Sequence, residues 1–391
     1  MLFGTGRGLF MVTAPAVALL PGFAPHLALA TLPAATVVIG NALAAWIASM
    51  ITRSTGRRVG FLIGTGLATV SAVMCFAAVI FANFWLLSIG GLVFGFFAGF
   101  AQLYRFAAAD GITERYRSIA ISLVLAGGVF SGFAGAGLAI WGENMVPRDW
   151  YAGDVGRFGG TFLFLLGTAI VAAFTLIFLR IPNLTKAQLE GEQRPMLEIM
   201  KQPVFIAAAV SATVAQCVMN FLMTATPIAM ISICGHSFGA TAGVIAWHTF
   251  AMFAPGVFTG FLVRKFGAVA MILIGLLLEA ACIGVALSGV KVIDFWLSMF
   301  LLGIGWNFTF TAATSLMTTA YTPAERAKTQ GMMNQIIYTV VACGALSSGA
   351  FIHFFGWNWV NIGAIPLLFI AVSVTLWYVA RKKTAPASLV S

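Results

Sequence analysis

The chain consists of long apolar segments separated by short breaks that contain charged residues, glycine or proline. Most segments have about 20 residues or more, the length that an α-helix needs to cross a bilayer. They do not alternate between polar and apolar positions as the strands of a membrane barrel do. We therefore predict an all-α polytopic membrane protein. Its twelve transmembrane helices are expected at 2–21, 28–52, 60–81, 84–109, 117–141, 159–180, 204–232, 239–263, 268–288, 294–319, 328–352 and 358–380.

The composition also indicates a membrane protein and excludes several other classes. Of the 391 residues, 61% are hydrophobic and only 8% are charged, whereas a soluble domain carries about 25% charged residues. This excludes a cytosolic enzyme, a secreted disulfide-rich protein and a disordered chain. The net charge of +10 does not indicate nucleic-acid binding, because the basic residues are scattered between apolar runs and form no continuous basic stripe.

The sequence carries no pattern typical of a cofactor or a catalytic centre. Its five cysteines form no CxxC or His-Cys cluster, so we interpret them as buried small apolar side chains. The patterns HExxH and GxxxxGK[ST] do not occur, which argues against a zinc hydrolase and an ATP-driven pump. The one GxSxG match, Gly235–Gly239, lies between two apolar helical segments and not at the strand-to-helix turn that a serine hydrolase needs. We expect no metal, no cofactor and no enzymatic activity.

Charge asymmetry predicts the orientation and the division of the chain. The longest polar connection, 181–203, separates an N-terminal half, 1–180, from a C-terminal half, 204–391, and we expect a short amphipathic helix within it. With the N-terminus in the cytoplasm, only three of the 21 Lys and Arg residues lie outside, as the positive-inside rule favours. Both termini are then cytoplasmic. The N-terminal segment could imitate a signal peptide, but it continues into further spans and we expect it to be the first helix.

The two halves repeat one another at a nearly constant offset, which indicates two six-helix units of like topology. The matches at offset 211 are Arg53–Gly56 with Arg264–Gly267, Phe61–Gly64 with Ile272–Gly275, Phe84–Leu86 with Phe295–Leu297, and Glu114–Arg115 with Glu325–Arg326; Thr13–Pro15 resembles Ala225–Pro227 at offset 212.

Parallel halves joined by a cytoplasmic linker are the plan of the major facilitator superfamily, and the loops of this chain resemble those of that family. Ser49–Arg58 is similar to the family pattern Gly-x-x-x-Asp-Arg-x-Gly-Arg-Arg/Lys, which Gly56, Arg57 and Arg58 match. Arg53 replaces the family's aspartate, and Arg264 does so in the second copy.

The resemblance implies that these loops control the conformational change. Because the usual acid is absent, Asp110 is a candidate partner for Arg53 or Arg57. The loops that carry Glu114–Arg115 and Thr322–Arg326 resemble the family's loops after helices four and ten. The candidate gating or coupling residues are Arg53, Arg57, Arg58, Asp110, Arg115, Arg264, Glu325, Arg326 and, inside the ninth helix, Glu279.

The resemblance also implies a function. It predicts a monomeric secondary active transporter of a bacterial inner membrane that moves a small polar, aromatic or anionic organic solute by rocking of its halves. The string from Gln102 to Asp110 is similar to one in a bacterial subgroup that has riboflavin carriers among its relatives. The alternatives are a proton-coupled drug or metabolite exporter and a non-transporting receptor or assembly protein of the same fold.

Polar side chains inside the predicted helices are the candidates for solute binding, because such residues are costly in a bilayer unless they are partnered or functional. Arg7 and Arg105 could bind a polar or anionic group of the solute. Alternatively, Arg7 extends to the cytoplasmic interface and Arg105 pairs with Asp110. The other candidates are Gln102, Gln216, Asn220, Trp247, His248, Trp306, Asn307, Asn334 and Tyr338.

Each of these amides and aromatic rings could instead join two helices. Together they predict a cavity for a neutral or weakly anionic solute with a ring that stacks on Trp. His248 and Glu279 are candidate proton carriers, because protons are a candidate coupling ion and histidine titrates near neutrality; a buried structural role is the alternative for both. Small residues four apart, at Gly91, Gly95 and Gly99 and at Gly128, Gly132 and Ala136, predict close helix packing.

Overall fold

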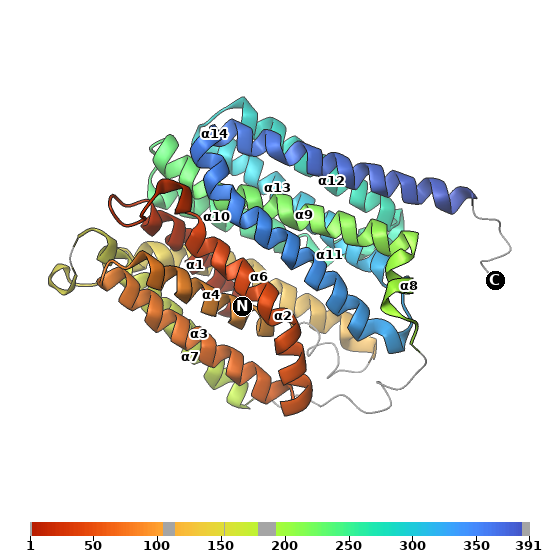
Figure 1. Cartoon of the computed structure of the whole chain (residues 1–391), viewed down its shortest axis with the longest axis horizontal. Coiled ribbons are helices and arrows are strands. Elements are labelled where there is room, and N and C mark those ends of the chain that lie inside the picture. Colours follow the sequence, from red (N-terminus) through yellow and green to blue (C-terminus); the bar gives the residue numbers. More distant parts are fainter. Residues whose placement is uncertain (1, 105–113, 152, 179–192, 385–391) are drawn as a thin grey trace.

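The computed structural model describes residues 2–104, 114–151, 153–178 and 193–384 (Figure 1). Within these ranges all regular structure is helical. The α-helices are α1 (Leu2–Ala18), α2 (Leu32–Thr55), α3 (Arg57–Ile80), α4 (Phe84–Ala101), α6 (Glu114–Gly142), α7 (Gly159–Phe178), α8 (Met196–Lys201), α9 (Pro203–Ile228), α10 (Phe238–Phe253), α11 (Gly256–Phe266), α12 (Ala268–Ser288), α13 (Val292–Met317) and α14 (Arg326–Thr384). Shorter helical segments are η1 (Leu27–Leu29), η2 (Arg148–Trp150), η3 (Val155–Phe158), η5 (Ala229–Ile233) and η6 (Pro323–Glu325).

Most of these helices are suited to a membrane. In the described ranges, eight helices are long and apolar enough to cross a bilayer, or nine if the bent pair α10 and α11 counts as one span. This confirms the prediction of an all-helical, multi-pass membrane protein. The number twelve stays a prediction: α1 has only 17 residues, and α14 runs through two of the predicted spans.

Two helix breaks have local causes in the sequence. The predicted span 239–263 is divided at Pro255, where α10 and α11 meet at 43°, because proline lacks the N–H that a helix needs and its ring collides with the preceding turn. In α14 the backbone leaves the helical conformation at Gly356, which has a φ of 77°. Glycine adopts this left-handed region without steric cost. The second break coincides with the boundary that the apolar pattern predicts between 352 and 358.

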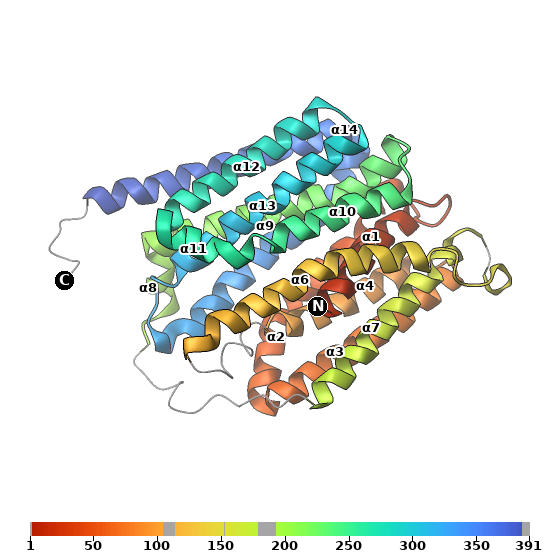
Figure 2. The same ribbon diagram turned by 180° about the vertical axis from the view of Figure 1, so that it is seen from behind.

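The helices gather into two groups that follow the order of the chain. In Figures 1 and 2, α1 to α7 lie together on one side and α9 to α14 on the other. Within the first group α2 packs on α4, α3 on α7 and α1 on α6; within the second, α9 packs on α14 and α12 and α10 pack on α13. The main contacts between the groups are α6 with α10 and α2 with α14.

Repeat-related positions have the same backbone geometry. Gly56 joins α2 to α3 with φ and ψ of 85° and 155°, and Gly267 joins α11 to α12 with 84° and 151°. Pro15 lies inside α1 and Pro227 inside α9. The sequence matches at offsets of 211 and 212 therefore correspond to equivalent turns and equivalent helix positions.

Stripes of small residues bring neighbouring helices into backbone contact. A Cβ atom built on Gly95 of α4 would lie 2.8 Å from the Cα of Gly40 in α2. A Cβ on Gly132 of α6 would lie 2.7 Å from the Thr249 Cβ in α10. The first stripe packs two helices of one group, whereas the second packs helices of different groups. No larger residue would fit at either crossing without a shift of the helices.

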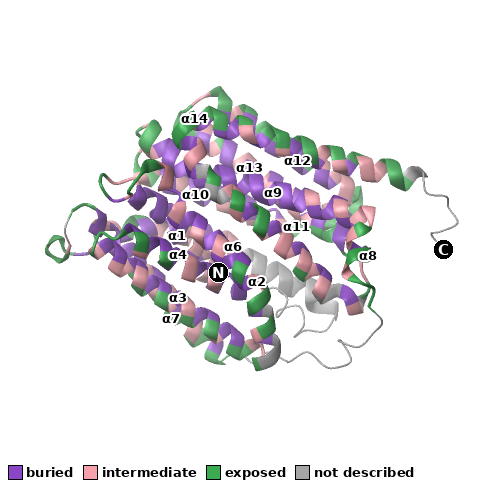
Figure 3. Cartoon of the chain, in the orientation of Figure 1, coloured by how far each residue is buried: buried purple, intermediate pink, exposed green. Residues whose placement is uncertain are grey.

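The burial pattern is that of a bundle surrounded by lipid. Figure 3 shows α9 buried along most of its length, whereas α12 and the last part of α14 present many exposed residues. Large apolar side chains face outward, among them Trp46, Phe130 and Phe369, which are 67%, 66% and 71% exposed. In water such a surface would favour aggregation, so the outer faces are suited to hydrocarbon.

The packing of the α4 stripe can be tested with Gly95→Ala. We expect a marked loss of thermal stability in detergent, because overpacking a tight contact costs about 1–3 kcal/mol and here the added methyl meets backbone. Gly66→Ala is the matched control, since Gly66 is exposed on α3 with no neighbouring heavy atom within 4 Å. The control should be neutral or slightly stabilising. Equal melting temperatures for both variants would contradict the assignment.

Candidate functional site

A partly buried hydrogen bond joins α9 to α13. Trp306 Nε1 donates to Gln216 Oε1 over 2.9 Å, and Gln216 is 3% exposed. The indole is also stacked on Phe310, with ring centroids 5.1 Å apart, and it meets the edge of Phe253. Asn220 lies one turn beyond Gln216 and donates to the Gln216 backbone carbonyl over 2.9 Å. The hydrogen bond to Gln216 and the ring contacts with Phe310 and Phe253 together fix the orientation of the Trp306 ring.

Two other predicted site residues hold α10, α11 and α13 together. Asn307 Nδ2 donates to the Met252 carbonyl over 2.6 Å, and its Oδ1 accepts from the Thr259 hydroxyl over 2.7 Å. Asn307 therefore connects α13 to the helices on both sides of the Pro255 break, and both ends of its amide are occupied.

His248 is completely buried in α10. Its Nδ1 lies 2.7 Å from the Met299 carbonyl oxygen in α13, a contact that requires the proton on Nδ1. Nε2 has no hydrogen-bond partner among the described residues. The Nδ1 atom thus joins α10 to α13, whereas Nε2 is a hydrogen-bond acceptor without a donor among the described residues.

Trp247 lies in an aromatic cluster between α6, α10 and α13. Its ring centroid is 5.3 Å from that of Phe133 and 5.7 Å from that of Trp296, and Phe250 completes the contacts on its own helix. Trp247 is 39% exposed, in contrast to the buried His248 beside it. Consecutive residues of a helix point about 100° apart, so the pair cannot serve one face together.

Arg7 faces the opposite group of helices from α1. It is half-buried, and in the described part of the chain it forms no hydrogen bond and no ion pair. The groups in its electrostatic range are the Tyr338 hydroxyl of α14 and the His248 imidazole of α10. Arg7, Tyr338 and His248 are thus brought together from three helices that span both groups.

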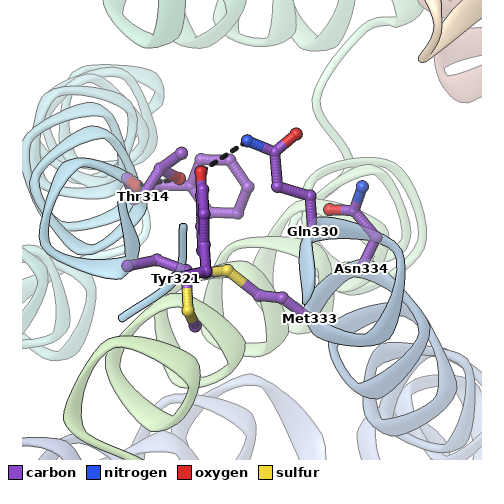
Figure 4. A pocket seen from close by; sticks show the side chains of 7 residues that line it. Thr314, Tyr321, Gln330, Met333 and Asn334 are labelled. Atoms are coloured by element: carbon purple, nitrogen blue, oxygen red, sulfur yellow. Dashed lines mark hydrogen bonds between the residues drawn. The ribbon is translucent and has the colours of Figure 1, made fainter. Parts of the chain in front are cut away.

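A pocket of about 120 Å³ lies farther along α13 and α14, toward the loop that connects them. Figure 4 shows Thr314 on one side, Gln330 and Asn334 on the other, and the Tyr321 hydroxyl between them. Gln330 Nε2 donates to that hydroxyl over 2.7 Å. The pocket is lined by Phe310, Thr314, Met317, Tyr321, Gln330, Met333 and Asn334.

The sequence predicts Asn334 as a site residue, but it does not point to Gln330, Thr314 or Tyr321, the polar side chains around it. Gln330 lies four residues before Asn334, which places both on one face of a helix, and this spacing was the available signal. Thr314 and Tyr321 come from a helix end and a loop, where polar residues are common and carry no signal of their own.

The loop residue Glu325 is clamped by the end of the linker. Arg194 donates to it from its backbone N over 2.9 Å, from Nε over 2.8 Å and from Nη2 over 2.7 Å, and Thr322 N adds a fourth bond of 2.9 Å. Arg194 and Gln202 also donate to the Ala320 carbonyl. These bonds fix the loop that carries Tyr321. The short helix expected in the linker is present as α8.

The other predicted gating or coupling residues are dispersed. Arg58 donates to the Ile177 carbonyl near the described end of α7, a favourable place for a cation because helix C-termini are partially negative. Arg57 is half-buried at the start of α3, and Arg264 is exposed in the last turn of α11.

Glu279 lies completely buried on α12 against Gly305 of α13, and neither carboxyl oxygen has a hydrogen-bond partner among the described residues. Gln102 forms the end of α4. Arg105 and Asp110 lie outside the described residues, as do the side chains of Arg53, Arg115 and Arg326.

The clamp on Glu325 makes a prediction about pH. The hydrogen bonds from the Arg194 side chain, and then the one from Thr322 N, hold the pKa of Glu325 well below its usual range. A depressed pKa contributes stability above the unfolded pKa, and this is lost only as the pH falls through the folded value. Glu325→Gln should therefore lower the melting temperature similarly at pH 5.5 and pH 8.

The matched control removes an exposed ion pair. Arg148 and Asp154 lie 3.6 Å apart with side chains 60% and 72% exposed, and such pairs contribute little. Arg148→Ala should leave the melting temperature within error. If Glu325→Gln behaved in the same way, the linker clamp would have no role in stability.

Comparison with known proteins agrees with this helical architecture. The family model described as Major Facilitator Superfamily matches residues 1–336 and again 215–390. The chain is 36% identical over 343 residues to "Riboflavin transporter RfnT" of Brucella anthropi, covering 87% of this chain and 84% of that protein.

Two relatives from Bacillus subtilis are each 29% identical. They are "Uncharacterized MFS-type transporter YddS", with 90% of this chain and 83% of the relative covered, and "Uncharacterized MFS-type transporter YdeG", with 82% and 77% covered. The matches extend over most of the chain and include both copies of the internal repeat. The chain therefore belongs to the Major Facilitator Superfamily and is a membrane transporter, not an enzyme.

Proposed function

We propose that this transporter moves a flat, polar aromatic solute by rocker-switch alternating access, and that riboflavin is the first candidate substrate. The observation that carries the proposal is the position of Arg7. Its guanidinium has no bonded partner in the described part of the chain and faces Tyr338 and His248 of the opposite helix group. A charged side chain within a bilayer is costly unless it serves a partner or a function.

The aromatic character of the solute follows from α13. Trp306 and Phe310 form a stacked pair whose orientation is fixed by Gln216. Rings held in this way can contact the flat face of a solute without losing conformational freedom on binding. The relative that is named a riboflavin transporter shares 36% identity over most of both chains, which makes riboflavin the first solute to test.

The proposed architecture has twelve spans in two halves, 1–180 and 204–391, joined by the linker 181–203. The matched turns at Gly56 and Gly267 support it, as do the contacts of α6 with α10 and α2 with α14. The distribution of Lys and Arg favours cytoplasmic termini in a bacterial inner membrane. In this orientation the pocket at Tyr321 lies on the cytoplasmic side.

We assign the predicted site residues different tasks. Arg7, Gln216, Trp306, Asn334 and Tyr338 are proposed to contact the solute, and Gln102 and Arg105 are proposed as further contacts. Asn220, Trp247, His248 and Asn307 are proposed to support the helices that carry these contacts. Conformational control is proposed for the remaining candidates, which are Arg53, Arg57, Arg58, Asp110, Arg115, Arg264, Glu279, Glu325 and Arg326.

Uptake of labelled riboflavin into proteoliposomes tests the proposal. The wild-type protein should accumulate riboflavin above empty liposomes, and Arg7→Ala should reduce the initial rate about tenfold or more, since a hydrogen bond to a charged group contributes about 1.5–3 kcal/mol. Lys382→Ala, an exposed cation at the end of α14, should have no effect. Repeating the assay with an imposed pH gradient tests protons as the coupling ion.

The possible failures are distinguishable. Wild-type vesicles that take up no riboflavin would refute the substrate but not the family. Wild-type uptake that Arg7→Ala leaves unchanged would refute the proposed site. Loss of uptake in the Lys382→Ala control would show that the assay reports protein quality and not binding.

A further inference from the structure

We infer that the pocket between α13 and α14 is a subsite for the imide or lactam edge of a planar heterocycle. The solute occupies it while it moves between the middle of the bundle and the end of the bundle that carries the α13–α14 loop. The inference rests on the proposed function and gives it a substrate class: neutral ring systems in which a carbonyl and an N–H lie side by side.

The polar groups of the pocket are amides and hydroxyls, which suit a neutral ligand. The residues that line the pocket include no charged side chain. The bond from Gln330 to the Tyr321 hydroxyl uses one amide hydrogen, which leaves the Gln330 carbonyl and the Tyr321 proton for a ligand. The Asn334 amide is half-buried and has no hydrogen-bond partner among the described residues. An unmade hydrogen bond in a partly buried position is unfavourable, so a ligand that completes it gains affinity.

Asn334 matches one ligand group best. A primary amide presents a donor and an acceptor side by side, and a cyclic imide or lactam presents the complementary carbonyl and N–H. Two parallel hydrogen bonds then fix the ligand in one plane. A carboxylate would meet the Asn334 carbonyl oxygen and would find no cation on the pocket wall.

The remaining walls suit a flat ring. Phe310 closes the pocket toward the middle of the bundle, and Met317 and Met333 provide flexible thioethers, which make favourable contacts with aromatic rings. The volume of about 120 Å³ is smaller than the roughly 300–1,000 Å³ of sites that enclose a whole ligand. The pocket therefore accommodates one end of a ring system.

Two rows of side chains connect the pocket to the middle of the bundle. Trp306, Phe310 and Thr314 are four residues apart on α13, and Gln330, Asn334 and Tyr338 have the same spacing on α14. Four residues correspond to about 6 Å of helix. One row is mainly aromatic and the other is polar, and the far ends of the rows reach Gln216 and the surroundings of Arg7. A planar solute can keep ring contacts on one side and hydrogen bonds on the other along this path.

The wall that carries Tyr321 is held in place by the linker. Ala320 accepts hydrogen bonds from Arg194 and Gln202, and Glu325 is clamped by Arg194. The position of the Tyr321 hydroxyl is thus set before any solute arrives, so ordering this loop adds no cost to binding.

The test compares riboflavin with its N3-methyl analogue, which keeps the ring system and the ribityl chain but lacks the imide N–H. Each flavin competes with labelled riboflavin for wild-type uptake in proteoliposomes. We expect riboflavin to compete about tenfold better than the N3-methyl compound, and Asn334→Leu to abolish this preference by weakening riboflavin alone. Asn334→Ala, which removes the amide without adding bulk, should have the same effect and serves if the leucine variant does not fold.

Gln335→Leu is the matched control, because this neighbouring amide donates to Thr339 on its own helix over 3.2 Å. It should keep the wild-type preference. Equal competition by both flavins in the wild type, or an unchanged preference in both Asn334 variants, would overturn the subsite while leaving riboflavin transport intact. Absence of riboflavin uptake by the wild type would refute the proposed substrate, and the subsite with it.

Discussion

A polar side chain inside a bilayer has no water to bond with, so its partner has to come from its own helix or from a neighbouring one. This requirement determines how α9, α10, α11 and α13 are held together. Gln216 meets Trp306 across α9 and α13, and Asn307 connects α13 to the helices on both sides of the Pro255 break. The same bonds that satisfy these amides fix the helix positions around the middle of the bundle.

Polar side chains that have no such partner are therefore informative about function. Arg7 and Asn334 have no hydrogen-bond partner in the described ranges, and both lie along one path, Arg7 near Tyr338 and Asn334 one turn of α14 away. Glu279 is also unpartnered among the described residues, but it is enclosed between α12 and α13. Asn334 lines the pocket, where a solute could complete its hydrogen bonds, whereas Glu279 is packed against Gly305 and borders no described pocket.

The sequence predicted the helices well because each apolar run is long and ends at a charge, a glycine or a proline. It did not predict the break at Pro255, since the apolar pattern continues across it from 239 to 263. The partners of the polar residues were also beyond its reach. Trp306 and Asn307 are adjacent in the chain but point to different helices, and Arg194 reaches Glu325 across 131 positions. Such pairings depend on the rotation and packing of whole helices, which residue types do not specify.

A ligand can shift a conformational equilibrium only through contacts that differ between the two states. Gln216, Trp306, Phe310, Asn334 and Tyr338 all belong to α9, α13 and α14 of the second helix group, in which α9 packs on both α13 and α14. Contacts with these residues alone would travel with that group and would bind the solute equally well in either state. Arg7 belongs to the first group, so in the proposed rocker-switch movement its distance from the solute would change. The Arg7 guanidinium is therefore the described group best placed to make solute binding sensitive to the movement, which is what alternating access requires.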